Sequence, residues 1–189
     1  MRPTPLNPLF APVTALKGVG PRLGKLFEKL GAPLVVDLLW HLPTGLIDRR
    51  HQPKIKDAKD GAIATLTVIV DQHQQPHNPR QPYRVRCRDE TGFLFLVFFH
   101  VHGDYIEKQL PVGATRIVSG KVEHYNNQIQ ITHPDHIVAP EEAATMKPIE
   151  PTYPLTQGLT PRVVGRAVDI ALGRAPELPE WLDPAYVKR

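Results

Sequence analysis

Three arginines at alternate positions of one short segment could bind a row of phosphates: Arg84, Arg86 and Arg88. On a β-strand, side chains two residues apart project from the same face, so these guanidinium groups would form a line of positive charge. Such a line can follow the backbone of a nucleic acid. The alternative is an outer face in contact with solvent, where Asp89 and Glu90 partly offset the charge.

The segment 93–99, FLFLVFF, carries four phenylalanines on a predicted strand. A ring left exposed where a strand ends can stack on a base, which contributes about 1–3 kcal/mol per base. Phe99 and its neighbour Phe98 are the candidates, and Tyr105 just beyond the turn is a third. The alternation leaves open which parity of the segment faces the core. The alternative interpretation is that all four rings are buried.

The turn GVGPRLGK, residues 18–25, could approach a phosphate closely. Gly18 and Gly20 leave room for the ligand, the helix that follows supplies unpaired N–H donors, and Lys25 adds charge. A tight turn between two packed helices is the alternative. Lys121, in a predicted strand, is a further candidate contact with a nucleic acid. Neither lysine lies in a Walker A pattern, so we expect no ATP-hydrolysing site and no cofactor in this chain.

Nine histidines raise the question of a metal site. The tightest pairs are His100 with His102 and His133 with His136, and no cysteine or third spaced ligand joins either pair. The sequence also lacks a Ser-His-Asp set or a pair of carboxylates with a spacing suited to catalysis. We therefore predict neither a metal site nor catalytic residues.

Composition sets the remaining bounds. The 189 residues are 41% hydrophobic and 22% charged, which is enough apolar material for a packed core. The net charge of +4 permits a polyanionic partner without requiring one. We expect no membrane span and no secretory signal, because the apolar runs are too short. Cys87 is the one cysteine, which fits a cytoplasmic protein without an internal disulfide.

The pattern divides the chain into three expected segments. Residues 1–60 predict a helical, helix-hairpin-helix-like segment, in which a helix begins near Pro21 and ends at Gly31. Residues 61–139 predict a β-domain. Residues 140–189 are rich in proline around one weak helix at 161–172, and we expect them to form a connector. A basic patch also runs from Arg49 to Lys59, broken by aspartates.

The β-domain has the layout of an OB-fold. Strands are predicted over five ranges: 62–70, 83–89, 93–99, 115–124 and 128–138. A short helix is predicted over 104–113, between the third and fourth strands. Five strands with one helix at this place form a Greek-key OB-fold barrel, so we expect a mainly β protein with a small helical N-terminal segment. The second hairpin should turn around Tyr125–Asn127.

Several stretches occur in an order that resembles the N-terminal region of the bacterial ATP-dependent DNA helicase RecG family. They are LKGVGPRLGKLFEKLG, VVDLLWHLPTGLIDRR, LVFFH, VSGKVE, IQITHPDH and IEPTYPLTQGLTPRVV. The resemblance runs from about Ala15 to Arg189. No single motif decides it, but the ordered set is specific.

The resemblance implies that the barrel is the family's wedge domain, which binds replication forks and Holliday junctions and splits their arms during DNA repair and recombination. It implies branched DNA as the partner and a C-terminal helicase motor, with ATP and Mg²⁺, in the full-length protein. We expect a monomer. Phe99, with Phe98 beside it, matches the family's Phe-Phe-Asn stretch, with His100 in place of Asn, and Tyr105 corresponds to a tyrosine of some members.

Two alternatives from other classes remain open on the residues alone. One is a stand-alone, non-enzymatic OB-fold protein that binds single strands. The other is a protein-interaction module whose aromatic face docks a polypeptide. The C-terminal stretch PTYPLTQGLT, which resembles the family's approach to the motor, favours the wedge.

Overall fold

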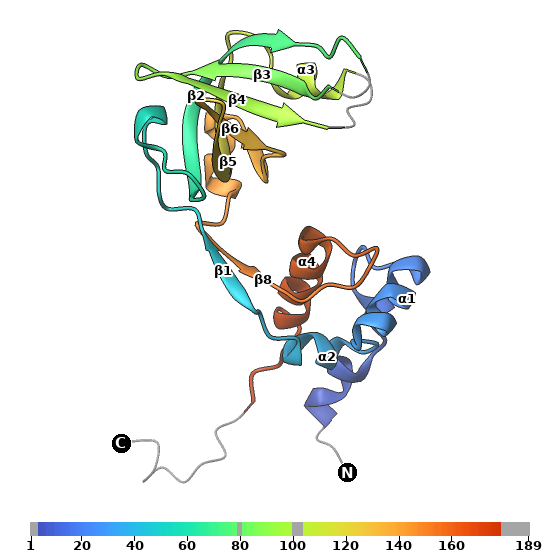
Figure 1. Ribbon diagram of the computed structural model, residues 1–189. Helices are drawn as coiled ribbons and strands as arrows, with labels where there is room; N and C mark the ends of the chain where they lie inside the picture. The colour runs from blue at the N-terminus through green and yellow to red at the C-terminus, as the bar shows by residue number, and fades with distance from the viewer. Residues whose placement is uncertain (1–3, 79–80, 100–103, 179–189) are drawn as a thin grey trace, which may run out of the picture. The chain divides into compact units, whose positions relative to one another are not determined.

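The computed structural model describes residues 4–78, 81–99 and 104–178, and the chain forms two compact units (Figure 1). One unit runs from Ile47 to Glu150 and contains a β-barrel. The other combines Met1–Leu46 with Pro151–Arg189 and contains the longer helices. These bounds differ from the three expected segments, because the last part of the chain shares a unit with the first.

The barrel is one sheet in the strand order β2-β3-β4-β6-β5-β7, closed by the pairing of β2 with β5. Its strands are β2 (Ile63–Gln74), β3 (Tyr83–Arg88), β4 (Phe93–Phe98), β5 (Thr115–Tyr125), β6 (Gln128–Thr132) and β7 (His136–Val138). The pair β4–β6 is parallel and the others are antiparallel. Strands β2 to β6 form the five-stranded barrel, and β7 adds a short pairing to β5.

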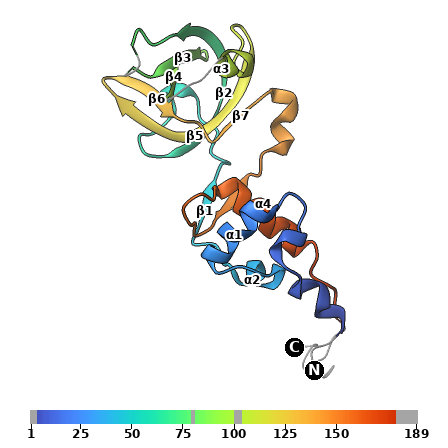
Figure 2. The same cartoon turned by 90° about the vertical axis from the view of Figure 1, so that its right-hand side faces the viewer.

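Helix α3 (Tyr105–Gln109) follows β4 in the chain and covers part of the barrel (Figure 2). Ile106 from this helix and Leu110 just after it are buried in the barrel core. A helix between the third and fourth barrel strands completes the OB-fold. The expected fold class is therefore confirmed. The predicted strands and helix of this unit are present, except that the expected strand 128–138 is divided into β6 and β7.

Strand β2 serves two partners because it bends. Its first half pairs with β5, from Ile63 to Ile69, and its second half pairs with β3. The register shifts between Val70 and Gln72, as a β-bulge does when it redirects a strand. The bend closes the sheet on itself and places the end of β2 beside the start of β3.

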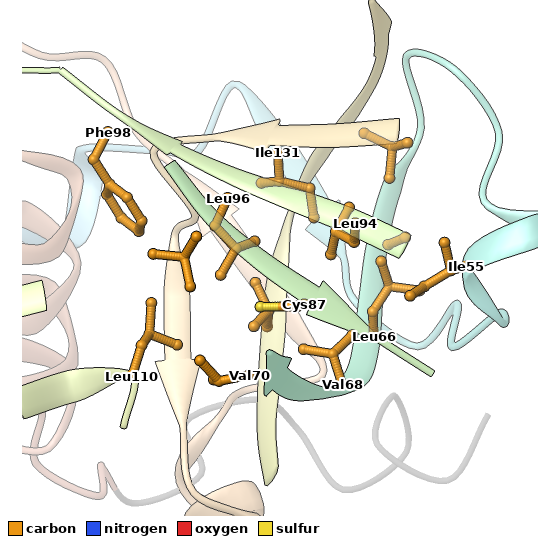
Figure 3. Packing of buried hydrophobic residues seen from close by; sticks show 14 of the residues in the cluster. Ile55, Leu66, Val68, Val70, Cys87, Leu94, Leu96, Phe98, Leu110 and Ile131 are labelled. Atoms are coloured by element: carbon orange, nitrogen blue, oxygen red, sulfur yellow. The ribbon is translucent and has the colours of Figure 1, made fainter. Parts of the chain in front are cut away.

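The even-numbered residues of β4 face the barrel core. Leu94, Leu96 and Phe98 are buried there, beside Cys87 from β3 and Ile131 from β6 (Figure 3). The odd-numbered positions face outward, although Val97 is also covered. This settles the parity that the alternation left open, and it removes the Phe98 ring, 7% exposed, from the candidate surface.

The helical unit holds α1 (Pro21–Leu30), α2 (Val35–Trp40) and α4 (Pro161–Leu172) around a second core. Helix α1 begins at Pro21 and ends at Gly31, which has a left-handed φ of 88°, as predicted. Short 3-10 helices span Thr4–Phe10 and Val13–Ala15 in this unit.

Helix α4 lies within the expected connector but is part of this core. It buries one stripe of small apolar residues: Val164, Ala167, Val168 and Ala171. The stripe packs in the same cluster as Phe27 of α1 and Leu38 of α2. A single short helix cannot bury a core alone, and here the N-terminal helices supply the missing surface.

Strands β1 (Gly45–Asp48) and β8 (Ile149–Thr152) form a two-stranded sheet. Two further 3-10 helices, Ile55–Asp57 and Pro140–Thr145, belong to the barrel unit. Among the residues that the structure describes, no helix has the length and apolar character needed to cross a membrane.

Three cations of the expected basic patch at 49–59 form ion pairs within the protein. Arg49 is 4% exposed and makes ion pairs with Asp135 (3.1 Å) and Glu150 (2.7 Å). Arg50 pairs with Asp48 at 2.6 Å. Lys54 makes a similar exposed pair with Glu90, also at 2.6 Å. These cations are therefore engaged within the protein, and Arg49 has a structural role.

Candidate nucleic-acid interface

A groove of about 1280 Å³ crosses the outer face of the barrel. Arg84 of β3, Val97 of β4 and Thr132 of β6 line it side by side, because these residues are register partners on neighbouring strands. The connection from β2 to β3 lines one side, and the β5–β6 turn lines the other. In OB-folds, this face and these two loops are where oligonucleotides bind.

The groove is polar but carries little charge. Its lining includes six glutamines: Gln72, Gln74, Gln75, Gln81, Gln128 and Gln130. Arg84 and Glu123 also line it, and Glu123 accepts hydrogen bonds from Thr132 (2.8 Å) and Gln130 (3.1 Å). These bonds hold the pKa of Glu123 below its ordinary value, so it stays ionised. Neutral amides can donate to and accept from a strand without reading its sequence.

Two arginines of β3 stack on phenylalanines of β4. The guanidinium carbon of Arg84 lies 4.3 Å from the centroid of the Phe95 ring, and that of Arg86 lies 5.2 Å from the Phe93 ring. Arg84 also donates to Gln128 Oε1 at 2.7 Å. Stacking on a ring keeps a guanidinium flat against the surface with its charge available. The arginines and aromatic rings predicted separately thus form one surface.

Asp71 of β2 neutralises part of the positive charge of the predicted row of arginines. Its carboxylate is 2.5 Å from Nε of Arg86 and 3.9 Å from Nε of Arg88. Arg84 lies at the other end of β3, beside the groove. Of the three arginines, Arg84 is therefore the one best placed to contact a nucleic-acid strand in the groove.

Phe99 follows β4 directly, is 44% exposed and lines the groove. Phe98, one residue earlier, points into the barrel core (Figure 3). The reason is the period of two along a strand, which sends consecutive side chains to opposite faces. The structure therefore keeps Phe99 as a candidate stacking residue and assigns Phe98 to the core.

Tyr125 is a groove residue that the sequence reasoning missed. It ends β5, is well exposed, and lines the groove together with Phe99. Asn126 and Asn127 follow it with positive φ values of 48° and 60°, so they form the tight hairpin turn that was predicted. An aromatic residue directly before an Asn-Asn turn is the signal that could have identified it.

The other predicted contacts do not line this groove. Tyr105 begins α3 and is 63% exposed, and Lys121 is exposed on β5 opposite Ile63. Gly18, Gly20 and Lys25 belong to the helical unit. Gly18 has a left-handed φ of 88°, whereas Gly20 is extended and precedes α1, on which Lys25 is exposed.

Tyr83, His73 and Glu107 join one end of the groove to α3. The Tyr83 hydroxyl lies 2.9 Å from His73 Nδ1 and donates to Glu107 Oε1 at 3.1 Å. Burial, and then the hydrogen bond to Glu107, raises the pKa of Tyr83 to about 12. Tyr83 is therefore neutral at physiological pH and serves to fix β3 against the helix.

Of the two close histidine pairs in the sequence, only His133 and His136 lie within the described residues. His100 and His102 lie outside the described residues. His136 lies 3.2 Å from Glu150, and His133 packs beside Phe99. Across the described ranges, no group of three or more histidine, cysteine or acidic side chains is arranged to hold a metal ion.

The closed barrel and its groove define a class, the OB-fold proteins, which bind nucleic acids or oligosaccharides on this face. Within that class, the chain belongs to a specific family. The model of the RecG wedge domain family matches residues 12–174, which is most of the chain.

Two relatives agree with this assignment. The ATP-dependent DNA helicase RecG of Pasteurella multocida is 27% identical over 163 residues, and that of Acidithiobacillus ferridurans is 30% identical over 176 residues. These alignments cover 85% and 90% of this chain but 23% and 25% of the relatives. The chain therefore spans about a quarter of the length of these relatives.

A solved structure of RecG bound to a three-way DNA junction has the same fold. It superimposes with a TM-score of 0.78 over 95% of this chain and 25% of that chain, at 24% sequence identity. At this identity the similarity establishes the fold, and the chemistry of the groove must be argued from the residues of this chain.

Proposed function

We propose that this chain is the junction-binding part of a helicase that acts on branched DNA, and that its groove holds a strand near the branch point. The observation that carries the proposal is the ring of Phe99. It is exposed at the end of β4 and lies in the OB-fold groove of a chain that belongs to the RecG wedge family.

The ring supports strand separation by stacking. Opening a base pair at a branch removes the stacking between that pair and the next. A ring that stacks on the exposed base replaces part of this energy, about 1–3 kcal/mol per base. Phe99 is placed to do this, and Tyr125 offers a second ring in the same groove. The protein thereby lowers the cost of parting the strands.

The polar residues of the groove support binding to DNA of any sequence. Arg84 provides a cation for a phosphate, with Arg86 and Arg88 further along the same strand. The glutamines provide hydrogen bonds that do not depend on one base. Contacts to the backbone and stacking on bases carry little sequence information, so the shape of the branch determines affinity.

The proposal includes a larger protein. In it, an ATP-driven motor that uses Mg²⁺ follows this chain and moves the duplex, while the barrel separates the arms. The full-length protein would act as a monomer in the cytoplasm, in DNA repair and recombination. Gly18, Gly20 and Lys25 of the helical unit, with Lys121 and Tyr105 of the barrel unit, are proposed as further contacts with the arms.

A binding experiment tests the proposal. Fluorescence anisotropy at one fixed salt concentration would give the affinity of the chain for a synthetic three-way junction, a duplex of the same sequence and one single strand. The junction should bind at least about fivefold more tightly than the duplex, since stacking on one base at an open branch contributes about 1–3 kcal/mol.

The same experiment separates the alternatives. Preference for the single strand over the junction would favour a stand-alone single-strand-binding protein. If the chain shows no salt-sensitive DNA binding, a protein-interaction module is favoured, because phosphate contacts always depend on salt. The OB-fold groove itself is the observation that keeps the single-strand alternative open.

A further inference from the structure

The imidazole of His133 lies between the two consecutive phenylalanines at the end of β4. The backbone N–H of Phe99 donates to Nε2 of His133 at 3.2 Å. The ring centroids of His133 and Phe99 are 5.8 Å apart with a tilt of 37°, and the Phe98 ring meets the same imidazole edge-on at 6.2 Å. One histidine therefore contacts both the ring in the core and the ring in the groove.

His133 has an unusual backbone conformation for its sequence. Its φ is 47°, in the left-handed region that residues other than glycine rarely occupy. It also precedes Pro134, and the proline ring further restricts its backbone. Such conformations cost about 1–3 kcal/mol and persist where the surrounding structure fixes them.

The surroundings of His133 do fix it. Its N–H donates to the carbonyl of Val97 at 2.9 Å, and the N–H of Asp135 donates to the carbonyl of Ser119 at 2.9 Å. Arg49 then holds the Asp135 carboxylate at 3.1 Å. The turn after β6 is thereby anchored on both sides of the strained residue.

Close packing against β5 adds to this anchoring. A Cβ on Gly120 would lie 3.4 Å from Cα of Pro134 and 2.7 Å from Cγ2 of Ile131. The backbone of the turn therefore approaches β5 as closely as a glycine allows. The barrel therefore holds the backbone of His133 in place.

Nε2 of His133 is the acceptor in this hydrogen bond, which requires the tautomer that carries its proton on Nδ1. The acceptor and the packed ring together restrict both the backbone and the side chain of Phe99.

We propose that His133 is the positioning residue that holds the Phe99 ring in the groove before DNA binds. The inference rests on the proposed stacking function of Phe99. A ring held in its bound orientation does not have to be ordered on binding, which saves about 0.5–1.5 kcal/mol for a side chain. His133 therefore increases affinity for branched DNA without contacting the DNA.

Two substitutions of His133 separate the role of its hydrogen-bond acceptor from the role of its backbone conformation. His133→Asn keeps a residue that tolerates the left-handed conformation, but its side chain is too short to reach the Phe99 N–H and has no ring. His133→Gln extends an amide oxygen to about the position of Nε2. Affinity for a synthetic three-way junction would be measured with the whole 189-residue chain.

The His133→Asn variant should weaken binding about 2- to 12-fold, and the His133→Gln variant should retain most of the native affinity. In a Phe99→Ala background, His133→Asn should cause no further loss, since it acts through that ring. An equal loss in both backgrounds would overturn the inference, because His133 would then act on DNA or on the whole fold. Unchanged affinity of His133→Asn in the native background would overturn it as well.

A measurement without DNA tests the hydrogen bond directly. In ¹⁵N-labelled protein, NMR should detect a scalar coupling between the Phe99 nitrogen and Nε2 of His133, and this coupling should be absent in His133→Asn. A protonated Nε2 in the free protein would overturn the inference. If Phe99→Ala itself leaves junction affinity unchanged, the stacking function fails together with the positioning role. If Phe99→Ala weakens binding and His133→Asn does not, only the positioning role fails.

Discussion

Two neighbouring phenylalanines differ completely in what they can do. Phe98 fills the barrel core with Leu94 and Leu96, whereas Phe99 lies at the mouth of the groove. Their chemistry is identical, so the difference comes from strand alternation alone. This contrast makes the pair a matched test of stacking against packing.

We predict opposite effects for the two alanine variants. Phe99→Ala should leave the free energy of unfolding nearly unchanged and weaken binding to a three-way junction about 5- to 150-fold, from the loss of stacking. Phe98→Ala should lower the free energy of unfolding by about 3–5 kcal/mol. Urea denaturation and anisotropy measure the two quantities. Unchanged junction affinity in a folded Phe99→Ala variant would remove this ring from the site.

Arginine charge in the barrel depends on partners that other strands provide. Arg86 is paired with Asp71 of β2, whereas Arg84 stacks on Phe95 and is hydrogen-bonded to a neutral amide. An arginine already paired with a carboxylate has less charge to offer a phosphate.

Replacing Arg84 should therefore change the salt dependence of binding more than replacing Arg86. Arg84→Gln should weaken junction binding and reduce the slope of log K against log salt by roughly 1, the contribution of one phosphate contact. Arg86→Gln is the matched control and should reduce the slope less. Titrations at several salt concentrations give both slopes, and equal slopes for the two variants would show that Asp71 does not select between them.

Sequence reasoning found those residues of the site that a pattern within a single strand can identify. The alternation of β3 and the end of β4 identified Arg84 and Phe99. Asp71, Tyr125 and His133 were missed as members of the site because each lies on another strand or turn, and strand register decides which of them meet. Register is fixed by long-range packing, which a local pattern does not contain.

At the scale of elements, the strands β1 and β8 are held together where Arg49 meets Glu150. Arg49 N–H donates to the Pro148 carbonyl at 2.8 Å, and its guanidinium reaches Glu150, Asp135 and Ser119. Burial acts to raise the pKa of Glu150, but hydrogen bonds from Arg49 and His136 outweigh it and leave the pKa below its ordinary value of 4.5.

This direction determines how stability depends on pH. A carboxyl group whose pKa is lower in the folded state stabilises the fold above its unfolded pKa, and the stabilisation is lost as the pH falls through the folded value. The free energy of unfolding should therefore decrease as the pH drops below about 4.5.

Glu150→Gln should lower the free energy of unfolding at pH 7 by about 1–3 kcal/mol and reduce the loss on acidification. Glu141→Gln, at an exposed position of a 3-10 helix, is the control and should have little effect. Urea denaturation between pH 3 and 7 measures both. A variant with the same pH profile as the native chain would contradict the role assigned to Glu150.

Most elements were predictable because they depend on local periodicity and turn residues. The period of two, the Asn-Asn turn and the Pro21 and Gly31 boundaries placed the barrel strands and α1. The partner of α4 was not predictable in this way. The helix itself was predicted, but only the fold shows that residues from the other end of the chain cover its apolar stripe.

At the scale of the whole molecule, the chain combines a groove on an OB-fold barrel with membership of the RecG wedge domain family. Its length is about a quarter of that of the helicases it resembles. The claim that joins these facts is that the Phe99 ring meets DNA at the branch and not along an arm.

Site-specific crosslinking to a three-way junction tests this claim most directly. With p-benzoylphenylalanine in place of Phe99, irradiation should attach the chain to nucleotides next to the branch point. The same substitution at Val112, which is exposed and does not line the groove, should give little product. Products spread evenly along the duplex arms, or none from Phe99 while the junction is bound, would contradict the account.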